Sequence, residues 1–135
     1  MGGDFGPSET VPAAIEAVAA KGLEVLLVGD PKELQAEIIR HSAETLPLKI
    51  IPSEDVIRDD ESPLQALRAK PKASAVIGVG LVKEGMADAF VTMGSTGAAM
   101  AASAFGLGLM DGIDRPALGG PIYGLAENTV LIELG

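Results

Sequence analysis

The chain of 135 residues lacks cysteine and tryptophan, and it contains a single histidine. The absence of cysteine excludes disulfides, thiolate metal sites and a cysteine nucleophile, and it fits a reducing compartment. Aromatic residues make up only 3% of the sequence, although 47% of all residues are apolar. A core of small aliphatic side chains and glycine suits packed α/β layers better than an all-β sandwich.

Positive charge is also scarce, since 10 Lys and Arg face 19 Asp and Glu and give a formal net charge of −9. Nucleic-acid binding is therefore not expected, because neutralising phosphates needs clustered Lys and Arg. No group of His, Asp and Glu has the spacing of metal ligands, and we expect neither a metal nor another cofactor. His41 falls at the end of a polar helical pattern, where a cation suits the helix dipole, and we do not expect it to act as a catalytic base.

No secretory signal is expected, because Met1 is followed by Gly-Gly-Asp and not by a basic and then an apolar segment. An uncharged stretch from 89 to 110 is long enough to span a bilayer. Its glycines, hydroxyls and alanines make it weakly hydrophobic. A strand, a turn and a buried helix explain this stretch better than a membrane span.

Helical and strand patterns alternate along the chain. The expected helices have apolar residues at helical spacing and cover about residues 9–21 (with Ser8 as N-cap), 31–44 and 98–110. The expected strands are short apolar runs bounded by turn residues, at 23–30, 48–53, 87–93 and 129–134. This alternation predicts an α/β fold with a mainly parallel sheet and helices on both faces.

Several stretches do not fit the alternation. Residues 53–63 carry five acids against one base and end in proline, which is typical of an exposed loop. Residues 73–82, ASAVIGVGLV, fit a strand and a buried helix equally. The first residues resemble the turn after a strand and the last residues end as a strand finishes. We therefore expect residues 1–135 to form a single α/β domain or the N-terminal part of a larger α/β domain.

The turn Gly94-Ser95-Thr96-Gly97 stands between an apolar run and a helical pattern, where α/β proteins bind ligands. Backbone amides at a helix start lack internal partners and attract anions, and glycine lets a phosphate approach the backbone. One interpretation is thus a phosphate cradle assisted by two hydroxyls. The other is a tight turn whose Ser or Thr caps the helix. The missing lysine excludes a Walker A loop.

Two further candidates have equally local alternatives. Asp4, at the end of the Gly-Gly-Asp segment 2–4, either orients a ligand or acts as an acid or base, or it caps a helix. Arg115 either binds phosphate oxygens or forms a surface pair with Asp111 or Asp114.

Four motifs, MGGDFGP, LVGDP, ADAFVTMGSTGAAM and GIDRPAL, occur in an order and at separations that resemble the bacterial phosphate acyltransferases of phospholipid synthesis, the PlsX family. DDESPLQALRAK matches as well. The resemblance covers nearly the whole chain but only about the first two-fifths of a family member. It implies a fold similar to that of isocitrate and isopropylmalate dehydrogenases, with residues 73–82 helical. It also implies a cytoplasmic homodimer, at most peripherally attached to the inner face of the membrane.

The activity implied by the resemblance is transfer of a fatty acyl group from acyl carrier protein to inorganic phosphate, which gives acyl phosphate. On this basis we hypothesise that the catalytic residues are Asp4, Ser95 and Thr96. The substrate-binding residues would be Gly2, Gly3, Gly94, Gly97 and Arg115. Ser95 replaces the asparagine usual in the family, and a hydroxyl reaches less far than an amide.

Acyl carrier protein is acidic, so an acidic chain needs a local basic patch to attract it. The only compact basic cluster is formed by Arg68, Lys70 and Lys72, which can equally be solvated charges at a helix end. The expected helix at 98–110 offers an apolar lining for the acyl tail, although burial in a core explains the same composition. Two other functions stay open: a phosphotransacetylase-like transfer that uses coenzyme A, and a noncatalytic phosphate- or acyl-binding fragment.

Overall fold

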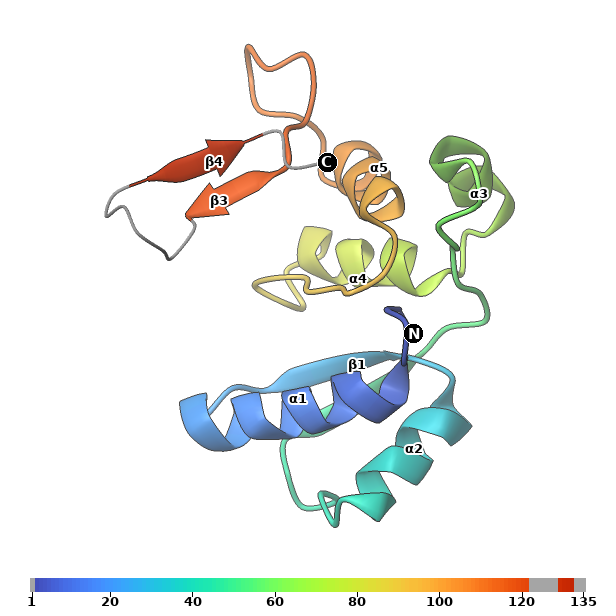
Figure 1. Cartoon of the computed structure of the whole chain (residues 1–135), viewed down its shortest axis with the longest axis vertical. Helices are drawn as coiled ribbons and strands as arrows, with labels where there is room; N and C mark the ends of the chain where they lie inside the picture. The colour runs from blue at the N-terminus through green and yellow to red at the C-terminus, as the bar shows by residue number, and fades with distance from the viewer. Residues whose placement is uncertain (1, 122–128, 133–135) are drawn as a thin grey trace.

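The computed structural model describes residues 2–121 and 129–132 (Figure 1). Along the chain the elements are α1 Pro7–Lys21, β1 Val25–Gly29, α2 Pro31–Arg40, β2 Leu48–Pro52, α3 Pro63–Ala69, α4 Ser74–Lys83, α5 Thr96–Gly106, β3 Gly119–Pro121 and β4 Val130–Ile132. The α/β class predicted from the alternating patterns is confirmed.

Strands β1 and β2 form a parallel pair with helices packed on it. Val25 lies opposite Leu48, and the register continues to Gly29 opposite Pro52. Alternate residues of the pair point to one face, where α1 and α2 both pack. The core on that face consists of Val11, Leu27, Leu34, Ile38 and Ala43. The opposite face is less covered, since Leu26, Val28 and Ile51 stay partly exposed, although α4 also contacts β1.

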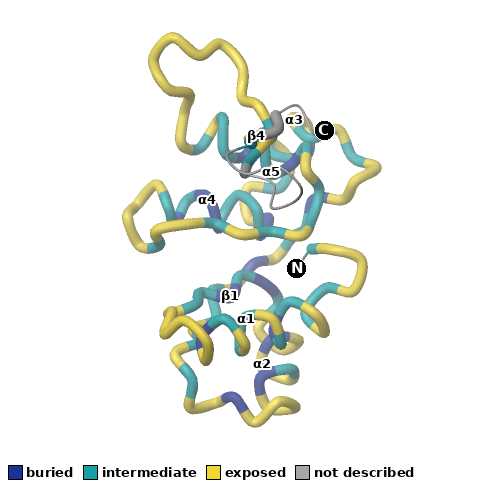
Figure 2. The backbone as a smooth tube through the Cα atoms, turned by 60° about the vertical axis from the view of Figure 1, so that its left-hand side comes forward, coloured by how far each residue is buried: buried dark blue, intermediate teal, exposed yellow. Residues whose placement is uncertain are grey.

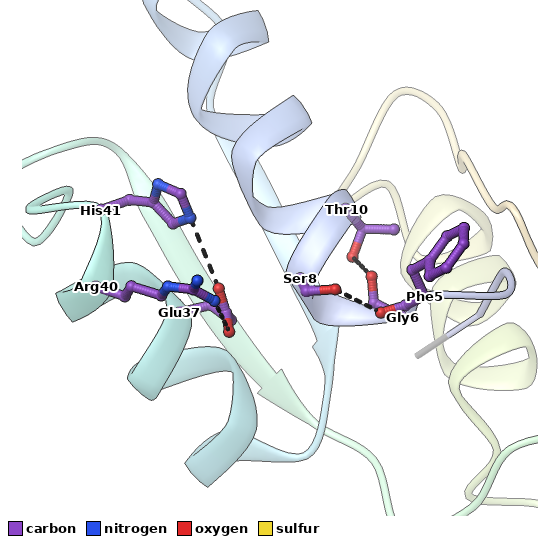
Figure 3. A network of polar contacts seen from close by, with 7 residues as sticks. All are labelled: Phe5, Gly6, Ser8, Thr10, Glu37, Arg40 and His41. Atoms are coloured by element: carbon purple, nitrogen blue, oxygen red, sulfur yellow. Dashed lines mark hydrogen bonds and ion pairs between the residues drawn. The ribbon is translucent and has the colours of Figure 1, made fainter.

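Helix α1 begins earlier than predicted, at Pro7, whose fixed φ suits a first helical position. Its N-cap is Gly6, with a φ of 56° and no side-chain capping bond, so the prediction that Ser8 caps this helix is wrong. The Ser8 hydroxyl instead donates to the Phe5 carbonyl at 2.8 Å, and the Thr10 hydroxyl donates to the Gly6 carbonyl at 3.1 Å (Figure 3). The helix ends at Gly22 in the left-handed region.

Helix α2 starts as the sequence predicts and ends sooner. The Asp30 carboxylate accepts from the backbone N–H groups of Lys32 and Glu33, at 2.7 and 3.2 Å, and so caps the helix. The helix stops at Arg40 and not at 44. Glu37 lies near the end, 3.5 Å from the Arg40 guanidinium and 3.6 Å from the His41 imidazole (Figure 3).

Helix α5 packs against both α3 and α4. Their small core contains Ile57, Ala66, Ala73 and Ala98, so the acidic segment 53–63, irregular as predicted, is not exposed throughout. The ambiguous stretch 73–82 lies in α4, as the family resemblance implies. Helix α5 ends at Gly106, short of the predicted 110, and the segment that follows it is exposed (Figure 2).

The predicted strand at 87–93 is wrong. No strand is present between α4 and α5, and the side chains of Val91 and Met93 are 84% and 71% exposed. An apolar run becomes a strand only when a neighbour accepts its backbone hydrogen bonds, and the described residues provide no such neighbour here. Phe90 instead packs over Gly78 of α4.

Of the second pair of strands, β3 and β4, only β4 was predicted. β4 confirms the centre of the strand expected at 129–134, whose last two residues lie outside the described part of the chain. β3 was not predicted, and it pairs antiparallel with β4 through Gly119 opposite Ile132. The sheets are therefore one parallel and one antiparallel pair, and the likeness to isocitrate dehydrogenase stays a prediction. Among the described helices, none has the length and apolar character needed to cross a bilayer.

We predict that Leu34→Ala lowers the free energy of unfolding by about 2–4 kcal/mol, because it removes a side chain that is 2% exposed from the core on β1 and β2. Urea unfolding followed by far-ultraviolet circular dichroism measures this loss. The matched control is Ile39→Ala on the same helix, 55% exposed, which should cost less than about 1 kcal/mol. Equal losses in the two variants would contradict the described core.

Candidate functional site

Two glycine-containing segments from distant parts of the chain meet backbone to backbone. A Cβ added to Gly2 would lie 3.1 Å from the Gly94 nitrogen and 3.2 Å from its Cα. Gly3 has a φ of 77°, and a Cβ there would lie 3.2 Å from the Met93 carbonyl oxygen. The structure therefore brings the predicted substrate-binding residues Gly2, Gly3 and Gly94 together, at a tight junction that favours glycine.

Thr92 supports this junction and was not predicted. Its Oγ1 accepts the Gly94 N–H at 3.1 Å and would lie 3.5 Å from a Cβ on Gly2. A threonine hydroxyl that binds the amide two residues later is a known turn motif. The Thr-x-Gly spacing could therefore have indicated this turn. Because the Gly94 N–H already donates to Thr92, it is not available to a ligand.

Ser95 is the N-cap of α5. Its Oγ accepts the Ala98 N–H at 3.3 Å, so the helix-capping interpretation describes what this side chain does in the structure. The next two amides differ, because no hydrogen bond in the described part of the chain involves the N–H groups of Thr96 and Gly97. Thr96 is exposed. The first turn of α5 thus presents two unoccupied donors beside a hydroxyl.

Pro63 fixes the opposite side of this turn. A Cβ on Gly97 would lie only 2.8 Å from Cγ of Pro63, the first residue of α3. Gly97 is therefore needed for helix contact, whatever else it binds. No sequence pattern indicates this role, because Pro63 lies in a different element.

Asp4 is exposed and follows Gly3 directly at the junction. The alternative that it caps a helix is not what the structure shows, since Gly6 occupies the N-cap position of α1 without a side-chain bond. Among the described residues its carboxylate makes no hydrogen bond or ion pair. It is therefore available to a ligand beside the 94–97 turn.

Arg115 is not brought to this turn. It lies in the exposed segment after the C-terminal end of α5, whereas Ser95 caps the N-terminal end, about 16 Å away along an 11-residue helix (Figure 1). An ion pair with Asp111 or Asp114 is likewise not seen in the residues that the structure describes. No contact among the described residues therefore supports either interpretation of Arg115.

Most of the predicted basic cluster is already paired. The Lys70 ammonium lies 2.6 Å from the Glu61 carboxylate and donates to the Val56 carbonyl at 3.0 Å. Lys72 pairs with Glu54 at 2.6 Å. These bonds attach the acidic segment 53–62 to the end of α3, so only Arg68 of the three has no ion pair among the described residues.

The Glu61 carboxylate has a lowered pKa. The backbone N–H of Arg58 donates to it at 2.8 Å and has the largest effect, followed by the hydrogen bond from Lys70. Both bonds favour the charged form. The segment before α3 is therefore held by a carboxylate that stays ionised at lower pH than an ordinary glutamate.

A groove of about 400 Å³ lies between α3, α4 and α5. Its lining is mainly apolar and includes Leu64, Leu67, Val76, Val79 and Phe105. Among the described residues that line it, Arg68 is the only charged one.

Comparison with known sequences gives a consistent result. The profile of a family described as "Fatty acid synthesis protein" matches residues 1–135. A "Phosphate acyltransferase" of Acaryochloris marina (strain MBIC 11017) is 52% identical over 137 residues, covering 100% of this chain and 40% of that protein. One from Trichodesmium erythraeum (strain IMS101) is 50% identical over 119 residues, covering 88% and 35%. One from Heliobacterium modesticaldum (strain ATCC 51547 / Ice1) is 46% identical over 136 residues, covering 100% and 41%. The chain spans about two-fifths of the length of these relatives.

We predict opposite effects for two helical glycines. Gly97→Ala should lower the free energy of unfolding by about 1 kcal/mol or more, because its Cβ strikes the rigid Pro63 ring. Gly80→Ala should raise it by about 0.5–1 kcal/mol, because a Cβ at Gly80 meets nothing within 4 Å and alanine favours a helix interior. Urea unfolding of both variants measures the difference. The same sign for both would contradict the packing of α3 on α5.

We also predict that Glu61 contributes stability at neutral pH and loses it in acid. Its folded-state pKa is depressed, so the contribution is present above the unfolded-state pKa and disappears as the pH falls through the folded-state value. Glu61→Gln should therefore be less stable than the unmodified chain at neutral pH and converge with it in acid. Unfolding curves across the acidic range test this, with the exposed Glu16→Gln as control. A constant difference at every pH would exclude the described bonds.

Proposed function

Because the chain belongs to the fatty acid synthesis protein family, we propose that it serves the transfer of a fatty acyl group from acyl carrier protein to inorganic phosphate, in phospholipid synthesis. The relatives that carry the name phosphate acyltransferase support the reaction class. The structural observation that carries the proposal is the unoccupied pair of amides at Thr96 and Gly97, next to the Gly2–Gly94 junction.

The proposed chemistry needs no covalent enzyme intermediate. A phosphate oxygen attacks the thioester carbonyl carbon, a C–O bond forms, the C–S bond breaks, and the thiolate leaves with the bonding electron pair. The protein then has two tasks. It holds the phosphate dianion against the carbonyl, and it stabilises the negative charge that develops on the carbonyl oxygen with donors already in place.

The first turn of α5 is suited to such charges. The amides of Thr96 and Gly97 point out of a helix start, where the dipole favours an anion, and the Thr96 hydroxyl adds a third donor. The Ser95 hydroxyl oxygen accepts a hydrogen bond from the Ala98 N–H, and its own O–H remains able to donate to a substrate. In this proposal Gly2, Gly3 and Gly94 let the two loops close together, and Asp4 orients a donor beside them.

The proposed role of Arg115 has less structural support than the roles of the other site residues. The expected role is anchoring phosphate, and the exposed segment in which it lies follows the far end of α5. A role at the same centre therefore requires that segment to fold back toward the 94–97 turn. Its role stays a prediction, and it is not used in the chemistry above.

The proposed donor is an acidic carrier protein, and its docking depends on positive charge. Lys70 and Lys72 are engaged with Glu61 and Glu54, so Arg68 is the residue of that cluster left to attract it. We expect the carrier to be bound with little electrostatic steering from this part of the chain. A homodimer, a cytoplasmic location and at most peripheral membrane contact remain predictions.

Incubation of the chain with acyl-carrier protein and phosphate, with acyl phosphate trapped as the hydroxamate, tests the reaction. Product from the carrier-protein thioester is the expected result. Product from acyl-coenzyme A alone would favour a phosphotransacetylase-like transfer. Phosphate binding without product would reduce the chain to a binding fragment, and neither binding nor product would overturn the proposal.

Thr96→Val is expected to weaken phosphate binding or turnover by about tenfold or more, since it removes a hydroxyl bond to a charged ligand and keeps the side-chain shape. Ser95 needs a matched pair, because Ser95→Ala also removes the cap of α5. Ser95→Gly also removes the hydroxyl but costs the cap only a few tenths of a kcal/mol. Weaker binding in both Ser95 variants, at nearly unchanged stability of Ser95→Gly, would assign the hydroxyl a ligand role. Unchanged phosphate affinity in Thr96→Val would show that the cradle assignment is wrong.

A further inference from the structure

The groove between α3, α4 and α5 has the size and chemistry of a ligand site. Its volume of about 400 Å³ falls within the range of roughly 300–1,000 Å³ found for small-molecule pockets. The walls are apolar, with Leu64, Leu67, Val79 and Phe105 among them, and Arg68 is the one charged group among the described residues that line the groove. An occupant with a long apolar part matches this lining.

Gly80 leaves free space in the groove, and helix packing does not require a glycine at this position. A Cβ at Gly80 meets nothing within 4 Å, whereas a Cβ at Gly106 would lie 2.6 Å from Val79 Cγ1. Gly106 is therefore needed for contact between α5 and α4. Gly80 is not needed for any contact between these helices, although glycine weakens a helix interior relative to alanine. The missing side chain at this position keeps the groove open.

Two helices link the groove with the proposed acyl-transfer centre. Helix α5 carries Ser95 at its start and the lining residues Ala102 and Phe105 further along, about 10–15 Å from Ser95 at the rise of an α-helix. The first residue of α3, Pro63, lies against Gly97, and the later residues Leu64, Leu67 and Arg68 line the groove. An extended chain that starts at the 94–97 turn can thus follow α5 into the groove.

We propose that this groove binds the alkyl tail of the fatty acyl substrate and that Gly80 sets how long a tail it accepts. The inference rests on the proposed function for the acyl class of the ligand. Arg68 is exposed and lines the groove, and its charge bounds the apolar part of the lining. Filling the space at Gly80 therefore shortens the accepted chain without touching the transfer centre.

The test uses displacement of a fluorescent fatty acid by octanoate, decanoate, dodecanoate and tetradecanoate, each below its micelle-forming concentration. For the unmodified chain, affinity should rise about fourfold with each methylene until the groove is full. Gly80→Val should weaken tetradecanoate binding at least tenfold and leave octanoate binding within about twofold. Gly120→Val is the matched control, since a Cβ at Gly120, outside the groove, also meets nothing within 4 Å, and it should change neither affinity.

Phe105→Ala provides a second route if Gly80→Val fails to fold. Its side chain is 71% exposed, so its truncation disturbs the fold little, and it should weaken the binding of every chain length. Affinity that does not depend on chain length, or an unchanged length profile in both groove variants, overturns the proposal and leaves another polypeptide segment as the occupant. The acyl phosphate assay is independent: length-dependent binding without acyl phosphate contradicts the proposed reaction alone, and acyl phosphate formed without length-dependent binding contradicts the groove alone.

Discussion

The contact between the backbones of Gly2 and Gly94 is the constraint on which the candidate site depends. Neither residue has a Cβ, and a Cβ on Gly2 would lie 3.1 Å from the Gly94 nitrogen, so a side chain there would push the two loops apart by a few tenths of an ångström. Gly97 repeats the arrangement against Pro63 and fixes α3. These contacts set the position of the first turn of α5 relative to Asp4 on one side and to the groove on the other. The geometry of the candidate site therefore depends on glycine at these positions.

Around the start of α5, some backbone amides have a hydrogen-bond partner within the chain and others have none. Ser95 satisfies the Ala98 amide and Thr92 satisfies the Gly94 amide, which stabilises the turn without a ligand. The Thr96 and Gly97 amides between them keep their capacity for hydrogen bonding. If the proposed anion binds here, a turn that is already stable has little left to reorganise during the reaction, which is the condition for effective electrostatic stabilisation.

The sequence predicted those features that depend on neighbouring residues. Pro31 predicted the start of α2, and the short apolar runs around Leu27 and Ile50 predicted the parallel pair. The strand at 87–93 was wrong because pairing depends on a partner elsewhere in the chain. The ion pairs of Lys70 and Lys72 could not be foreseen, since Glu61 and Glu54 lie 9 and 18 residues away in an irregular segment. Family resemblance supplied the association of residues 2–4 with 94–97, and the structure added Thr92 and Pro63.

The Lys70 ammonium links the salt content of the solution to the geometry of the site. Its bond to Glu61 is partly exposed and weakens as dissolved ions screen it, whereas its bond to the neutral Val56 carbonyl is screened less. Pro63 stands between Glu61 and the rest of α3, and it is the residue that abuts Gly97. We therefore expect higher ionic strength to loosen the contact of Pro63 with the 94–97 turn, through an ion pair that lies outside the proposed site.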